Sequence, residues 1–215
     1  LMIFVFLTSY YSHNITFKIA AMRTLTNFNK TPLHSINFKT IFSFIALVCF
    51  TQIGFGQATI YSENFTGQDG KGAIGSASGA TTDLSGVDWT IDISSATLSA
   101  DTDWFKVTNE IFEARDIDGN AIWQSKSINI SGFSNVSLSL SAVEVGTMES
   151  SDIFKTEYRI DGGTWTPADT NGSLNDDFTS ATVSQTGLSG STLEIRVTMN
   201  NGADSEKHRL DDILV

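Results

Sequence analysis

Carboxylates on otherwise apolar strands are the first residues of this chain whose placement indicates chemistry. Residues 209–215 place Asp211 and Asp212 among large apolar side chains. Residues 59–65 place Glu63 on one face with large aromatic groups. An ionised carboxylate in apolar surroundings is costly unless it is paired, hydrogen-bonded or bound to a metal. We therefore expect the two stretches to pair as strands, with their acids meeting at a calcium ion or in a hydrogen-bond network.

Two further segments could supply oxygen ligands. The loop 66–72 could bring Asp69 towards Glu63, although an ordinary flexible loop is the alternative. The run Asp116-x-Asp118-Gly-Asn120 resembles half of a calcium loop, but it lacks the downstream glutamate of an EF-hand, so a plain turn is the alternative. The predicted ligands of a structural calcium are Glu63, Asp69, Asp211 and Asp212.

Tryptophans that face solvent can stack on sugar rings, and the chain has four tryptophans. Trp89 and Trp123 share the apolar parity of their strands, which predicts that both lie in the core. Trp104 follows a polar loop and is the best candidate for an exposed ring. The residues predicted to bind a ligand are Trp104, Asp116 and Asp118.

Nucleophilic catalysis has little support in the sequence. His208 is the single histidine after residue 57, no cysteine follows residue 57, and no Gly-x-Ser-x-Gly motif is present. A pair of carboxylates that cleaves a glycosidic bond remains an alternative, because acids are plentiful and no spacing singles out two of them.

A change in charge marks a leader at residues 1–57. All 24 acidic residues and nine of the 13 lysines and arginines follow residue 57, so residues 58–215 carry a net charge of −15. Lys39 closes a basic segment, residues 41–53 are apolar, and Gly54, Gly56 and Gln57 follow. The apolar run is short for a membrane span and fits a cleaved signal peptide. The chain begins with Leu1 rather than Met, which indicates an over-extended gene start.

The remaining residues, 58–215, are expected to form one secreted domain. A charge of −15 argues against nucleic acid and anionic membranes as partners, and no membrane insertion is expected after signal cleavage. Apolar residues recur at period two, as in 87–93, 136–143 and 192–199, between segments rich in Gly, Ser and Asp. This pattern predicts an all-β fold, an antiparallel β-sandwich (jelly roll) of about ten strands.

Several short motifs resemble a group of known proteins. Glu63-Asn-Phe65, Tyr158-Arg-Ile-Asp-Gly-Gly-Thr-Trp165 and Leu210-Asp-Asp-Ile213 are similar to segments of secreted multidomain proteins of Bacteroidetes-type bacteria. More loosely, the chain resembles jelly-roll carbohydrate-binding modules with a structural calcium, and MAM-like domains. The resemblance implies that Glu63 and Asp211 are calcium ligands. It also implies a neighbouring catalytic or sorting domain. The last strand ending at Val215 indicates either a domain cut from a longer protein or a gene fragment.

These observations predict a non-catalytic extracellular module that binds a polysaccharide or a cell-surface glycan. One alternative is a structural or adhesive sandwich domain that spaces its neighbours or binds protein. A second alternative is a jelly-roll glycosidase or polysaccharide lyase.

Overall fold

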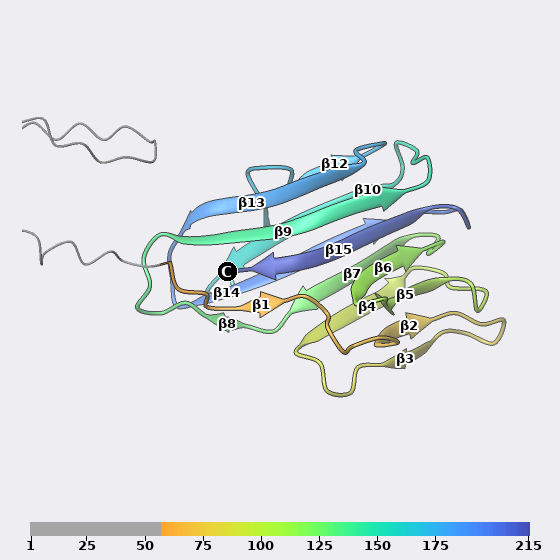
Figure 1. The fold of residues 1–215 in the computed structure, drawn as a ribbon, viewed down its shortest axis with the longest axis horizontal. Coiled ribbons are helices and arrows are strands. Elements are labelled where there is room, and N and C mark those ends of the chain that lie inside the picture. The colour runs from red at the N-terminus through yellow and green to blue at the C-terminus, as the bar shows by residue number, and fades with distance from the viewer. Residues whose placement is uncertain (1–56) are drawn as a thin grey trace, which may run out of the picture. The chain divides into compact units, whose positions relative to one another are not determined.

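Two antiparallel sheets lie face to face in residues 57–215, the part of the chain that this computed structural model describes (Figure 1). Sheet A has the order β13 (Ser180–Leu188), β9 (Val136–Val145), β15 (Lys207–Leu214), β6 (Ile111–Arg115), β5 (Trp104–Thr108), β2 (Gly72–Ile74) and β3 (Thr81–Asp83), with β1 (Ser62–Glu63) also paired to β15. Sheet B has the order β11 (Thr166–Pro167), β10 (Ile153–Ile160), β14 (Thr192–Asn200), β7 (Asn120–Ser125) and β4 (Trp89–Ser95), with β12 (Ser173–Asn175) on β10 and β8 (Ile128–Asn129) on β14. The predicted antiparallel sandwich is confirmed.

The strands outnumber the ten that the sequence predicts. Fifteen strands are present in residues 57–215, and six of them have only two or three residues. Such short strands carry too few residues to show an alternating pattern. The predicted signal peptide lies outside the described residues, except for Gln57. Within residues 57–215, no helix has the length and hydropathy that a membrane crossing requires.

Alternation along the strands builds the core. On β9, Val136, Leu138, Leu140 and Ala142 face inward, and the three positions between them, which face outward, are serines. β14 repeats the arrangement with Leu193, Ile195, Val197 and Met199 inward, as its period-two pattern predicts (β14 also supplies outward charges). The inward residues of each strand therefore pack in the core between the sheets, and the outward residues form the solvent-facing surface of each sheet.

Aromatic rings fill the half of the core between β1, β4 and β7. Trp89 and Trp123 are fully buried, which confirms the prediction from their parity. Phe112 lies against Trp89 with ring centroids 5.3 Å apart and against Phe105 at 4.7 Å, both edge to face. Buried aromatic side chains each remove about 150–250 Å² from water, so this cluster is a major source of stability.

The first and last strands pair, as the sequence predicts. Ser62 lies opposite Leu214 and Glu63 opposite Ile213. Beyond the strand ends, the amide of Ile60 donates to the carbonyl of Val215 at 2.7 Å. The C-terminus therefore lies beside the start of the described chain (Figure 1).

Loops that are distant in sequence lie together at the end of the sandwich opposite the C-terminus. The chain crosses between the sheets at several connections, since β6, β9 and β15 belong to sheet A whereas β7, β10 and β14 belong to sheet B. The β6–β7, β9–β10 and β14–β15 connections consequently lie at one end of the sandwich (Figure 1). Asn201 in the last of these loops is fully buried, and its backbone carbonyl accepts from the amides of Ile117 and Asp118. We call this end, formed by these loops and the segment 96–103, the loop end.

Candidate functional site

Glu63 takes part in a hydrogen-bond chain that reaches the core. Its side chain is 8% exposed, and its Oε1 accepts from the amide of Phe65 at 2.7 Å and from Nε2 of Gln68 at 2.9 Å. The Oε1 of Gln68 in turn accepts from Nε1 of Trp89 at 2.8 Å. These hydrogen bonds supply the partners that a buried carboxylate oxygen requires. Glu63 therefore belongs to a hydrogen-bond network, and its hydrogen-bond partners are Phe65 and Gln68 rather than the aspartates of the last strand.

A bulge in β15 places the two aspartates of the last strand. Asp211 lies opposite Ser141 of β9, whereas Leu214 lies opposite Ser139, so the register shifts between them. Asp212 adopts a left-handed backbone with a φ of 50° and is exposed. The bulge turns Ile213 inward, which explains why apolar residues of this stretch occur at both parities.

The four predicted calcium ligands do not form one cluster. Asp211 is partly buried, and burial raises the pKa of its carboxyl; the charges of Asp212 and Glu63 act in the same direction, and the hydrogen bond from the amide of Asp212 opposes them. Asp69 is exposed and points elsewhere, since its Oδ1 accepts from the amide of Glu110 at the β5–β6 turn at 2.8 Å.

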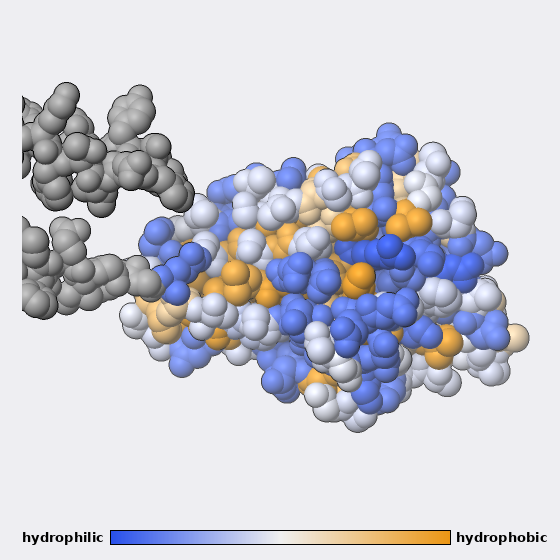
Figure 2. Space-filling view, viewed as in Figure 1, coloured by the Kyte–Doolittle hydropathy of each residue, from blue (hydrophilic) through white to orange (hydrophobic). Residues whose placement is uncertain are grey.

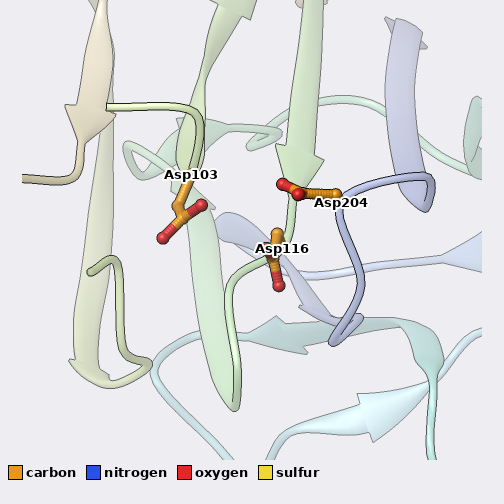
Figure 3. A group of neighbouring side chains, drawn as sticks. All are labelled: Asp103, Asp116 and Asp204. Atoms are coloured by element: carbon orange, nitrogen blue, oxygen red, sulfur yellow. The ribbon is translucent and has the colours of Figure 1, made fainter. Parts of the chain in front are cut away.

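Three loop aspartates meet at the loop end instead (Figure 3). Asp103, Asp116 and Asp204 come from the segments before β5, after β6 and before β15, and one carboxylate oxygen of each lies within 4.8 Å of the others. Arg115 partly neutralises the group, because it pairs with Asp204 at 3.2 Å. Asp103 is also satisfied by the protein: its Oδ2 accepts from the amides of two preceding loop residues.

Asp116 is the least satisfied member of this group. Burial, followed by the nearby charges of Asp103, Asp118 and Asp204, raises the pKa of Asp116 to about 6. Asp116 and Asp118 both have left-handed backbone, with φ values of 48° and 42°. The segment 116–120 is therefore a tight turn that brings one of the predicted ligand-binding aspartates into a carboxylate group and leaves the other, Asp118, exposed beside it.

A second carboxylate group escaped the sequence analysis. Glu149 and Asp152 of the β9–β10 loop meet Glu206 of the β14–β15 loop, with one oxygen of each within 4.8 Å of the others. Asp152 is 4% exposed and Glu206 is 3% exposed, and no ion pair engages either residue within the described chain. The hydrogen bond to Asp152, together with the charge of Glu206, raises the pKa of Glu149. Asp152 and Glu206 lie 54 positions apart in the sequence, so only the connections between the two sheets could have revealed the group.

His208 lies behind the second group, inside the sandwich. It is 1% exposed, and its ring stacks on Phe178 with centroids 6.0 Å apart and meets the edge of Phe154 at the same distance. Burial lowers the pKa of His208 to about 4, although Asp152 opposes the shift. A histidine held neutral between two aromatic rings is a core residue, and it has no surface for a substrate.

The outer face of sheet B carries a shallow depression of about 340 Å³. A straight row of side chains crosses its strands, because Asp92 of β4 pairs with Ile122, Ile122 with Thr198, and Thr198 with Lys155. An adjoining depression of about 320 Å³ shares Ile153 and Lys155 with the first and continues over β12. The larger depression is lined by Asp92, Ser94, Ser95, Asn120, Ile122, Ile153, Lys155, Glu157, Arg196 and Thr198.

The charges of this depression balance one another. Glu157 pairs with Lys155 at 2.9 Å and with Arg196 at 2.7 Å. Burial acts to raise the pKa of Glu157, but the hydrogen bonds from Lys155 and Arg196 outweigh it and hold the pKa below its usual value. Arg196, which lines the depression, lies 4.5 Å from the ring centre of Trp165, so a cation covers this ring.

Trp104, the predicted ligand-binding tryptophan, lies on the outer face of sheet A. It is partly buried, and its Nε1 donates to Glu113 at 3.0 Å. The cationic groups of Arg115, Lys106 and Lys207 lie 4.8, 5.1 and 5.6 Å from its ring centre. The three predicted ligand-binding residues thus do not share one site, since Trp104 belongs to an open sheet face and Asp116 and Asp118 belong to the loop end.

Comparison with known proteins gives no family for this β-sandwich domain. No family model and no curated protein matches the chain. Among solved structures, the chain is similar to the carbohydrate-binding module TmCBM61 in complex with β-1,4-galactotriose, at 10% identity and a TM-score of 0.38, over 61% of this chain and 88% of that one. It is also similar to the K3 cleaved adhesin domain of Lys-gingipain from Porphyromonas gingivalis W83, at 8% identity and a TM-score of 0.41, over 73% and 98%. Similarity at this level transfers no residue role.

Proposed function

We propose that residues 57–215 form a secreted, non-catalytic module that binds a neutral polysaccharide across the outer face of sheet B. The observation that carries this proposal is the depression on that face, where polar side chains from four neighbouring strands surround Ile122 and Ile153. Ligand sites typically combine a concave surface of about 300–1,000 Å³ with a few directed polar groups.

The chemistry of the depression suits hydroxyl groups. A sugar hydroxyl both donates and accepts hydrogen bonds, so carboxylates, amides, hydroxyls and cations can all bind it. Asn120 and Thr198 provide uncharged groups, and Asp92 and Glu157 together balance Lys155 and Arg196, so no net charge is left there to attract an ionic ligand. The two isoleucines provide an apolar surface for the C–H face of a sugar ring.

The shape favours an internal stretch of polymer. The row from Asp92 continues through Lys155 to Ser173 of β12, so it crosses five strands. Four inter-strand steps of about 4.8 Å give a length of roughly 19 Å, which exceeds a single sugar ring. Both depressions lie along this row and stay open to solvent, so a chain can enter and leave at either end.

Two observations favour binding over cleavage. Hydrolysis of a glycoside requires a carboxylic acid whose pKa is raised. In the depression, hydrogen bonds from Ser94 lower the pKa of Asp92, and Lys155 and Arg196 lower that of Glu157. His208 is buried in the core and cannot replace them as a general acid.

The test is a titration of the purified chain with neutral polysaccharides, among them galactan, xylan and mannan, followed by calorimetry. Asn120→Ala and Thr198→Val are each expected to lower the affinity for the bound polymer about tenfold, because each removes a hydrogen-bonding group from the depression. Gln124→Ala is the matched control, since Gln124 lies on the same strand as Asn120 but outside the depression. Absence of binding to every neutral polymer would favour the adhesive or structural alternative.

Secretion and calcium belong to the proposal. The leader at residues 1–57 supports export. The pairing of β1 with β15 supports an ion between the terminal strands, and the carboxylate groups of the loop end offer oxygen ligands of the kind that calcium prefers.

A further inference from the structure

Several cationic side chains lie together on the outer face of sheet A, on the side of the sandwich opposite the depression on sheet B. Four of the nine lysines and arginines in residues 57–215 lie there around Trp104. Figure 2, seen from this side, shows hydrophilic residues over β15 and β6, with hydrophobic residues beside them along β9. We call this surface the cationic patch; its members are Trp104, Lys106, Arg115, Lys207 and Arg209.

Strand register arranges the patch in two parallel rows. One row runs Trp104–Arg115–Lys207 across β5, β6 and β15. The other runs Lys106–Glu113–Arg209 across the same strands. On β9, Val145 continues the first row and Val143 the second, and both are uncharged. Side chains directly opposite on neighbouring strands lie about 5 Å apart, so the positive charges are held close together.

The patch keeps a net positive charge. Glu113 has a side chain only 4% exposed and binds Arg209 at 2.8 Å and Lys207 at 3.5 Å. Arg115 is balanced by Asp204. Because Arg115 faces the group of three loop aspartates, the remaining cations Lys106, Lys207 and Arg209 stand against Glu113 and the bordering Asp211, which leaves a charge of +1. Within residues 57–215, no ion pair engages Lys106, which is held over the ring of Trp104.

The position of these positive charges on an acidic domain indicates a negatively charged ligand. The surrounding domain carries −15, so nothing in its overall charge favours a positive surface. A single buried glutamate does not need several cations, yet Glu113 lies beneath Lys106, Lys207 and Arg209. The valines of β9 supply apolar contact beside the charges, as a sugar chain requires.

We propose that the cationic patch is a second binding surface, which takes a polysaccharide bearing carboxylate or sulfate groups. The proposal rests on the proposed glycan-binding function and extends it to an acidic ligand. It uses residues separate from the depression on sheet B. Trp104 serves as the support that holds the cations rather than as a stacking platform, because cations already occupy its surroundings. Repulsion from the rest of the domain is screened beyond about 8 Å at physiological ionic strength, so the nearby charges decide binding.

The experiment is affinity electrophoresis and calorimetry of the purified chain with polygalacturonate, fully methyl-esterified polygalacturonate and heparin. The double variant Lys106→Gln/Lys207→Gln is expected to weaken the bound polyanion at least about tenfold, because two charge-assisted contacts are lost. It keeps Trp104, Glu113 and the Arg209 pair, so its thermal midpoint checks that the fold is intact. Lys126→Gln is the matched control, because Lys126 is an exposed lysine paired with Asp88 outside the patch.

The outcomes separate the two binding surfaces. Preference for polygalacturonate over its ester identifies a carboxylate ligand, and preference for heparin identifies a sulfate ligand; both support the patch. Equal affinity for the ester, polygalacturonate and heparin, no effect of the double variant, or equal binding of a DNA oligonucleotide overturns it. Asn120→Ala must leave polyanion binding unchanged, and the lysine variant must leave neutral polysaccharide binding unchanged, so failure of one surface is distinguishable from failure of the other.

Discussion

Gln68 joins Glu63 to Trp89: it donates to the carboxylate at 2.9 Å and accepts from the indole at 2.8 Å. One amide side chain thereby gives the indole of Trp89 its acceptor and gives Glu63 a second donor beside the amide of Phe65. The first strand, which has only two residues, is held to the sandwich by this connection as well as by its pairing to β15.

Removal of this amide is expected to destabilise the domain. Gln68→Ala leaves the buried Nε1 of Trp89 without its partner, which costs about 1–3 kcal/mol. Chemical denaturation followed by tryptophan fluorescence measures the change. Gln124→Ala on the outer face of sheet B is the control, with an expected change below about 0.5 kcal/mol. An equal effect of the two substitutions would show that the connection contributes nothing specific.

Calcium is expected to stabilise the folded chain, and this stabilisation is expected to require the acidic residues of the terminal strands. Binding to the folded state alone at 100 times the Kd adds about 2.7 kcal/mol. That corresponds to several degrees in the thermal midpoint at this size. Glu63→Gln and Asp211→Asn are expected to abolish the shift between calcium and chelator. If the shift survives both but disappears in Asp116→Asn or in Glu206→Gln, the ion lies at the loop end instead.

Glu206→Gln is expected to raise stability when a chelator is present. The substitution removes one of three neighbouring carboxylates, two of them buried, and a glutamine can still accept from the amide of Gly202. The raised pKa of Glu149 means that the folded state favours its protonated form, so stability lost to repulsion returns as pH falls. The gain from Glu206→Gln is therefore expected at pH 7 and should shrink at pH 4. A loss of stability at both pH values would contradict repulsion.

His208 is expected to oppose that trend. Its folded pKa of about 4 lies below the usual value of 6.5, so the folded state excludes a proton that the unfolded state binds. Its contribution is complete above pH 6.5 and is lost as pH falls towards 4. His208→Phe keeps an aromatic ring between Phe154 and Phe178 and removes the titration. Thermal midpoints from pH 7 to pH 4 are expected to fall less steeply in the variant; parallel curves would refute the assignment.

The sequence predicted the elements whose signal is local. The alternation in β9 and β14, the core positions of Trp89 and Trp123 and the pairing of the chain ends all follow from parity and charge. The bulge at Asp212 was hidden, because an inserted residue makes both parities apolar and imitates a strand buried on two faces. The loop-end groups were hidden for another reason: Asp116 and Asp204, or Asp152 and Glu206, meet only after the chain has crossed between the sheets.

Trp104 shows the limit of composition most directly. The preceding polar loop correctly indicated a position outside the core. Its neighbours Arg115 and Lys207 come from other strands and lie 11 and 103 positions away in the sequence. No local pattern could therefore show that the ring supports cations, or that the positive charges of an acidic domain collect on one face.

The bond between Ile60 and Val215 has a consequence for chain connectivity. Because the two ends of the sandwich sequence are adjacent in space, a short linker could join them without displacing either strand. New termini could then be opened at the exposed turn that contains Phe133, outside both proposed binding surfaces. For the same reason, the domain could be inserted within a loop of a host protein, with entry and exit of the chain at a single point.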